Sequence, residues 1–119
     1  MAVWTVKGGR QGEREARLLE QGLLGGGWEQ VSSLQGVQDR EELAVLDAKG
    51  YPDVAVKTAS SYVGQLWSLV HRMQVDELVV LPLKTTGTIA VGRITGPYQY
   101  RTDLGPDLTH VRPVKWKRT

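Results

Sequence analysis

Residues 75–100, VDELVVLPLKTTGTIAVGRITGPYQY, contain the pattern that decides the fold. Leu78–Leu81 is a short apolar run with two valines at its centre, and Thr88–Thr95 is a longer run rich in β-branched residues. Both runs have the length and composition of β-strands. Between them, Pro82 and Gly87 interrupt the pattern as turn residues do. The stretch therefore predicts two neighbouring antiparallel strands joined by a loop.

A tyrosine pair follows the second of these strands. After the turn signal Gly96-Pro97, Tyr98 and Tyr100 stand at positions i and i+2 of an extended segment, so their side chains point to the same face. Two interpretations are open at this point. The pair can pack on a hydrophobic face, which is the usual role of aromatic residues, or it can form one wall of an aromatic pocket.

Three further segments have strand patterns: Val3–Lys7, Trp28–Val31 and His110–Trp116. Trp28 and Gln30 share one face of the second segment, and we expect Trp28 in the core. Gly25-Gly26-Gly27 is expected to end the unit before it. Because proline cannot donate to a sheet ladder, Pro113 predicts that the last strand lies at an edge.

Three segments have helical patterns: Gln11–Gly22, Asp39 to about Gly50, and Ser60 or Ser61 to about Met73. Asp39 with Glu42 three residues later predicts a capped N-terminus, and Gly50 suits a left-handed C-terminal cap. Ser60 or Ser61 is expected to cap the third helix. Its apolar face, with Val63, Leu66, Trp67 and Val70, places Trp67 in the core.

Length and composition limit the class of protein. A chain of 119 residues predicts one domain spanning residues 1–119, and this size can bury a core without staples. The chain has no cysteine, which excludes disulfides and cysteine-ligated zinc. It has no signal-peptide pattern and no apolar run long enough to span a bilayer, so we expect a cytoplasmic protein with no membrane partner.

The charge is divided unevenly between the two halves of the chain. Residues 1–60 carry seven basic and nine acidic side chains, whereas residues 61–119 carry eight basic and four acidic ones. A basic half suits a polyanionic partner, although a solvated surface explains the same excess.

The sequence contains no arrangement of residues typical of an enzyme. His71 stands alone on a helix and is expected to be a surface or half-buried residue, while His110 suits a structural hydrogen bond or donation to a phosphate or base. The glycine runs lack phosphate-binding spacing. We therefore expect no catalytic residues, no metal and no cofactor.

The aromatic residues are four tryptophans and four tyrosines, with no phenylalanine. Tryptophan and tyrosine suit surfaces that are apolar yet form hydrogen bonds, and they stack well on nucleobases. With basic neighbours, these residues can stack on nucleobases, or most of them can belong to the core.

Several blocks resemble the N-terminal domain of Mrr-like, modification-dependent restriction proteins. They are WTVKGGRQGE from Trp4, GQLW from Gly64, DELVVLPLK from Asp76, IAVGRITGPY from Ile89 and HVRPVKW from His110. The central block also resembles the wider PUA-like superfamily, which includes EVE, YTH and SRA domains. One departure is Val75-Asp76-Glu77, where Gly-Asp is usual.

The resemblance implies an α+β fold, a PUA-like curved β-barrel of about five to six strands flanked by about three helices. It also implies a DNA-binding specificity module that takes a modified, methylated base, flipped out of a duplex, into an aromatic pocket. The tail Trp116–Thr119 would then lead toward a C-terminal nuclease domain of a longer protein. An RNA-binding PUA-like accessory domain and a protein-interaction module remain the alternatives.

Position in the fold pattern of these relatives implies the site. The expected base pocket consists of Ser60, Ser61, Tyr62, Tyr98, Tyr100 and Asp103. The expected phosphate contacts are Lys57, Lys84, Arg93, Arg101 and Arg112.

Overall fold

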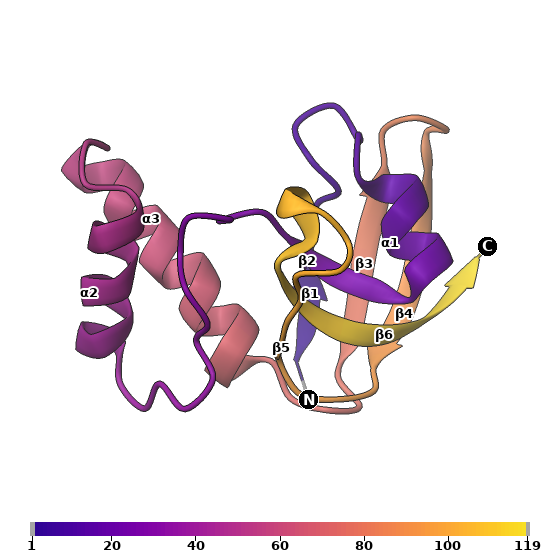
Figure 1. Ribbon diagram of the computed structural model, residues 1–119. Helices are drawn as coiled ribbons and strands as arrows, with labels where there is room; N and C mark the ends of the chain where they lie inside the picture. The colour runs from indigo at the N-terminus through magenta and orange to yellow at the C-terminus, as the bar shows by residue number, and fades with distance from the viewer. Residues whose placement is uncertain (1, 119) are drawn as a thin grey trace.

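The computed structural model describes residues 2–118, without the side chain of Arg118. In this part of the chain, three α-helices flank a six-stranded mixed sheet (Figure 1). This arrangement confirms the predicted α+β class with a curved sheet and helices. Thr119, at the end of the tail predicted to lead toward a nuclease, lies outside the described residues.

The hairpin of residues 75–100 forms as predicted, but its first strand runs two residues further and includes Pro82 and Leu83, which were expected in the loop. Strand β3 (Leu78–Leu83) pairs antiparallel with β4 (Thr88–Ile94), with Leu78 opposite Arg93 and Leu83 opposite Thr88. Strand β1 (Val3–Thr5) pairs in parallel with the other edge of β3. The alternation of buried Val79 and Leu81 with less buried neighbours fixes the register, because one face of β3 covers the core.

Strand β6 (His110–Arg118) bends the sheet. Its second half pairs with β4, whereas its first half pairs with β2 (Leu23–Gly26) on one side and β5 (Gln99–Tyr100) on the other. The strand order is β1-β3-β4-β6-β2, with β5 beside β6. The two strands that end this order, β1 and β2, are each paired on one side among residues 2–118.

The prediction that Pro113 places the last strand at an edge was wrong. Pro113 lies where β6 changes neighbour from β5 to β4, and its carbonyl accepts the Thr95 N–H at 2.9 Å. The missing proline donor falls at this change of partner, so no ladder bond is lost. Gly96 approaches the proline ring closely, because a Cβ built there would be 2.8 Å from Pro113 Cγ.

The prediction of a short strand at Trp28–Val31 was also wrong. The strand is β2, which begins five residues earlier and includes two of the glycines expected to end the preceding unit. A Cβ at Gly25 would collide with the His110 carbonyl, so the glycines allow β2 to pair closely with β6. Trp28 instead begins a turn closed by a 2.9 Å bond from the Val31 N–H to its carbonyl.

The helices are α1 (Glu15–Gln21), α2 (Arg40–Gly50) and α3 (Val56–Trp67), and α3 continues into the π-helical turn η1 (Ser68–Arg72). The Asp39 cap is confirmed, since its Oδ1 accepts the Glu42 N–H at 2.8 Å. Gly50 is not a left-handed cap. It lies inside α2 and leaves room for the backbone of Gln30, which a Cβ would approach to 2.5 Å.

The predicted start of α3 was wrong, because the helix begins at Val56 after the uncapped Ala55, one turn before the two serines. Leu66 of α3 is fully buried, and Leu69 of η1 is 4 % exposed. Trp67 packs on the core but remains half-buried, with its ring 4.3 Å from that of His71.

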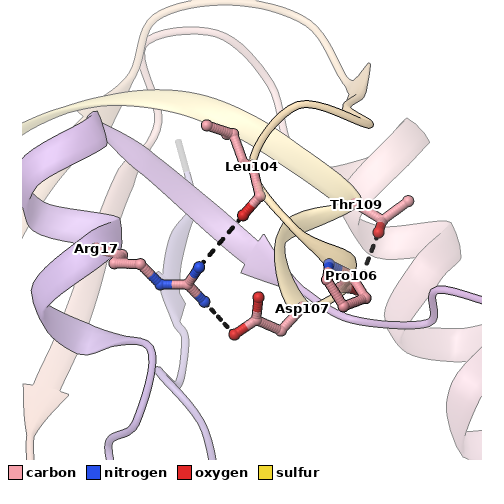
Figure 2. A network of polar contacts seen from close by, with 5 residues as sticks. All are labelled: Arg17, Leu104, Pro106, Asp107 and Thr109. Carbon is pink, nitrogen blue, oxygen red and sulfur yellow. Dashed lines mark hydrogen bonds and ion pairs between the residues drawn. The ribbon is translucent and has the colours of Figure 1, made fainter.

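Helix α1 is tied to the turn that precedes β6. Arg17 donates to the Leu104 carbonyl at 3.2 Å and forms an ion pair with Asp107 in the 3-10 helix η2 (Pro106–Leu108), as Figure 2 shows. The hydrogen bond from this guanidinium lowers the pKa of Asp107. At the other end of α1, the buried Glu15 carboxylate accepts from the Lys84 N–H at 2.8 Å. These contacts hold α1 against the hairpin on one side and against η2 on the other.

Candidate nucleic-acid-binding site

A cavity lies between the two end strands of the sheet and the helical segment α3–η1. Its volume is about 630 Å³. The walls come from four parts of the chain: Trp4–Lys7 on and after β1, Arg14 at the start of α1, Leu24–Gly26 with Trp28, and Ser61, Gly64, Gln65, Ser68, Leu69 and Met73 of the helical segment. The volume falls within the roughly 300–1,000 Å³ of small-ligand sites.

Two half-buried tryptophans line this cavity. Trp4 donates its indole N–H to Glu77 Oε1 at 2.9 Å, and the Arg72 guanidinium carbon lies 5.5 Å from the centre of its ring. Trp28 meets the ring of Tyr62 edge to face, with 6.3 Å between the ring centres. Both indoles are therefore held by contacts outside the cavity, as a preformed stacking site requires.

Trp28 has an unusual backbone conformation. Its φ is 47°, in the left-handed region that bulky residues rarely adopt. Such strain costs about 1–3 kcal/mol and persists where the surrounding structure holds it in place. Strain at a cavity-lining tryptophan supports a functional role for this residue.

A buried hydrogen-bond chain holds the Trp28 turn. The two acceptors at His110 Nε2 are the carbonyls of Val31, at 2.9 Å, and Trp28, at 3.2 Å, so Nε2 carries the proton. His110 Nδ1 then accepts from the Tyr98 hydroxyl at 2.7 Å, and that hydroxyl accepts the Leu34 N–H at 3.1 Å. This chain fixes residues 28–34 and with them the position of the Trp28 ring.

The burial of His110 in this hydrogen-bond chain predicts that the folded domain loses stability in mild acid. Burial lowers the pKa of His110 below its usual value of about 6.5, so the unfolded chain binds more protons than the folded one in that range. The free energy of unfolding should therefore be highest above about pH 6.5 and should fall as the pH decreases from there toward 5. Urea unfolding at a series of pH values measures this slope.

The matched variants for this experiment are His110→Asn and His71→Gln. The dependence of the unfolding free energy on pH between about 6.5 and 5 should disappear in the first variant. It should persist in the second variant, which keeps His110. A parent protein equally stable at pH 7 and pH 5.5 would contradict the role assigned to His110.

The polar groups of the cavity suit a ligand that is partly polar. Ser61 accepts from Gln65 Nε2 at 3.0 Å, and Ser68 lies one turn further along the helical segment. Among the described residues that line the cavity, the two charged side chains are the cations Lys7 and Arg14. The cavity therefore combines aromatic rings, hydroxyl and amide groups and a positive charge.

The structure separates the predicted base-pocket residues. Ser61 lines the cavity, and Tyr62 supports Trp28 from behind, while Ser60 is exposed on the same helix. Tyr98 is only 6 % exposed and belongs to the core, so its assignment to an open pocket was wrong. Burial raises the pKa of Tyr98 to about 12. A buried hydroxyl needs partners, and His110 and Leu34 supply them.

Two other pocket predictions lie elsewhere. Tyr100 is half-buried against the His110 ring, at 5.4 Å between ring centres. Asp103 is exposed and accepts two hydrogen bonds from Arg101, at 2.7 and 2.8 Å. Neither residue is part of the cavity wall.

The five predicted phosphate contacts divide into three groups. Lys57 is exposed one helical turn before Ser61, so it lies on the cavity side of α3. Lys84, Arg93 and Arg101 are bonded to the Arg10 carbonyl, to the Asp76 carbonyl and to Asp103, respectively. Arg112 is 3 % exposed and donates to backbone carbonyls, so its assignment to a phosphate was wrong.

Sequence reasoning missed Trp4, Lys7 and Arg14. Trp28, which was expected in the core, is half-buried, packs against the core and also lines the cavity. The available signal was that Trp28 follows three glycines, because two of them, Gly25 and Gly26, line the cavity without side chains. The spatial arrangement depends on β1 and β2 lying on the same side of α3, and no local pattern contains that information.

Within residues 2–118, no group of three or more His, Asp or Glu side chains is placed to hold a metal ion. No helix there is both long and apolar enough to cross a lipid bilayer.

Comparison with known proteins identifies one family. The matching family model is described as a domain of unknown function (DUF8426), and it covers residues 4–119. No curated protein and no solved structure matches the chain. Because the family model spans nearly the entire sequence, the chain belongs to the DUF8426 family.

Proposed function

We propose that this domain is a non-catalytic reader that binds a methylated base, flipped out of a DNA duplex, in the cavity lined by Trp4 and Trp28. The observation that carries the proposal is the pairing of these two anchored indoles with a positively charged, partly polar wall. A flipped base loses its stacking in the duplex, and aromatic rings replace it.

The apolar part of the wall supports a methylated ligand. Leu24, Leu69 and Met73 form it together with the indoles. A methyl group on a base adds apolar surface that gains free energy when it is removed from water, at about 25 cal/mol per Å². A cavity with this wall therefore binds a methylated base more tightly than the same base without the methyl group.

The cations near the cavity suit the phosphates on either side of the base. Lys7 is in the wall, Arg72 lies over Trp4, and Lys57 is one turn from Ser61. Such contacts position the nucleic acid without reading its sequence. The resemblance to Mrr-like restriction proteins supports a role in directing a C-terminal nuclease domain to the modified site.

The proposal predicts that Trp28→Gly weakens binding by about 1–3 kcal/mol per lost stacking ring. Glycine is the suitable replacement because it adopts the positive φ of Trp28 without strain, which limits the effect on folding. Fluorescence anisotropy would measure binding to duplexes that carry one methylated base, with unmethylated duplexes and single-stranded RNA of the same sequence as comparisons.

The matched control is Trp67→Ala, which removes a half-buried tryptophan outside the cavity wall. We expect its affinity for the methylated duplex to equal that of the parent. Equal binding of methylated and unmethylated duplexes by the parent would reject the proposed function, and tighter binding of the RNA would favour an RNA-binding accessory domain.

A further inference from the structure

Arg14 is the N-cap residue of α1, and its backbone is fixed on both sides. Its N–H donates to the Gly8 carbonyl at 2.7 Å, and its carbonyl accepts the Leu18 N–H at 2.9 Å. The side chain leaves this anchored backbone and contributes to the cavity wall. Its position therefore depends on the fold rather than on a mobile loop.

The Arg14 guanidinium lies against Gly26 of β2. A Cβ built on Gly26 would be 2.9 Å from Nη2 and 3.1 Å from Cζ, so a side chain at this position would displace the group. The glycine thus makes space for the guanidinium in the wall between β2 and α1.

One donor of the Arg14 guanidinium, Nε, has no hydrogen-bond acceptor in the described part of the chain. This nitrogen is buried, and by contrast Arg17, Arg101 and Arg112 each donate to carboxylates or carbonyls. A buried donor without a partner costs free energy. An acceptor supplied by a ligand in the cavity would remove that cost.

Guanidinium chemistry limits which bases satisfy this group. A guanidinium group only donates hydrogen bonds, and its planar pair of N–H groups matches two adjacent acceptors on one edge of a base. Guanine presents O6 and N7 in this way, and cytosine presents O2 and N3. Adenine places an amino donor beside N7, and the two oxygens of thymine are separated by an N–H, so neither base offers the pair.

We infer that Arg14 is a specificity-determining residue that selects a base with two adjacent acceptors, guanine or cytosine, over adenine and thymine. This inference rests on the proposed function, because it concerns the base held in the same cavity. Arg14 makes the selection from the wall, while the indoles supply stacking that every base can form.

The test uses four duplexes that differ in one central base, placed opposite an abasic site so that every base is extruded easily. The parent should bind the guanine or the cytosine duplex at least about tenfold more tightly than the adenine and thymine duplexes, as expected for a bidentate contact. Substitution with 7-deazaguanine or 3-deazacytosine removes one acceptor, and the base whose preference then disappears is the one that Arg14 reads.

Three variants distinguish the hydrogen-bonding geometry of the Arg14 guanidinium from its positive charge and from effects on folding. Arg14→Lys keeps the charge and should bring the four affinities within about threefold of one another. Gly26→Ala, which displaces the guanidinium, should do the same. Arg17→Lys, on the next turn of α1 and outside the cavity wall, should keep the preference. Thermal melting of each variant confirms that it is folded.

The outcomes distinguish the two proposals. If the duplexes bind but adenine or thymine binds as tightly as guanine and cytosine, the role of Arg14 is rejected while the reader function stands. If Arg14→Lys weakens all four duplexes equally, Arg14 is a general phosphate contact and the inference also fails. If none of the four duplexes binds more tightly than a fully paired one, the role of Arg14 is rejected, and the reader function is decided separately by the comparison of methylated with unmethylated duplexes.

Discussion

Replacing Tyr98 with alanine is expected to destabilise the folded domain by about 3–5 kcal/mol, as for other large buried aromatic residues. The side chain is packed in the core, and its hydroxyl joins the Leu34 N–H to His110. The variant removes the ring and both hydrogen bonds together. Urea unfolding followed by tryptophan fluorescence would measure the loss.

Two companion variants show which part of Tyr98 matters. Tyr98→Phe keeps the ring and leaves two buried groups unpaired, so it should cost about 1–3 kcal/mol. Tyr100→Ala removes a half-buried ring and should cost less than Tyr98→Ala. A Tyr98→Ala variant with unchanged stability and lost DNA binding would mean that this tyrosine does form an open pocket.

Replacing Arg112 with methionine is expected to cost about 3 kcal/mol of folding free energy, since three backbone carbonyls lose their donors at once. Its Nη1 donates to Leu69 and Met73 at 2.9 and 2.8 Å, and its Nε donates to Gly96 at 2.9 Å. Methionine retains much of the apolar stem, so the loss reports mainly the hydrogen bonds.

The control for Arg112 is Lys115→Met, which removes an exposed cation from the same strand and should change stability by less than about 0.5 kcal/mol. Leu69 and Met73 line the cavity, so Arg112→Met should also weaken DNA binding through the position of η1. Unchanged stability with a smaller dependence of DNA affinity on salt would instead identify Arg112 as a phosphate contact.

The sequence predicted those elements whose cause is local. The hairpin of residues 75–100 follows from two apolar runs on either side of turn residues, and the Asp39 cap follows from one side chain and its neighbour Glu42. The same local rules failed at Gly25 and Pro113, because both residues are placed by the close packing of strands far apart in sequence.

The candidate site was harder to predict than the fold. Its walls combine residues 4–7, 14, 24–28 and 61–73, which the chain brings together only after the sheet has formed. A tryptophan in a half-buried wall has the same sequence signature as one in the core, so Trp28 could not be assigned from spacing. Arg14 had no signal at all, since its role depends on the absence of a side chain at Gly26.

The parallel pairing of β1 with β3 has a consequence for synthesis on the ribosome. Trp4 emerges early, yet its indole partner Glu77 lies 73 residues later, and the strand that β1 pairs with begins at Leu78. Long-range pairings of this kind form late in folding because closing the intervening loop costs entropy. A nascent chain in which β3 has not yet been synthesised therefore lacks one wall of the cavity, and ligand binding can begin only when most of the domain has been translated.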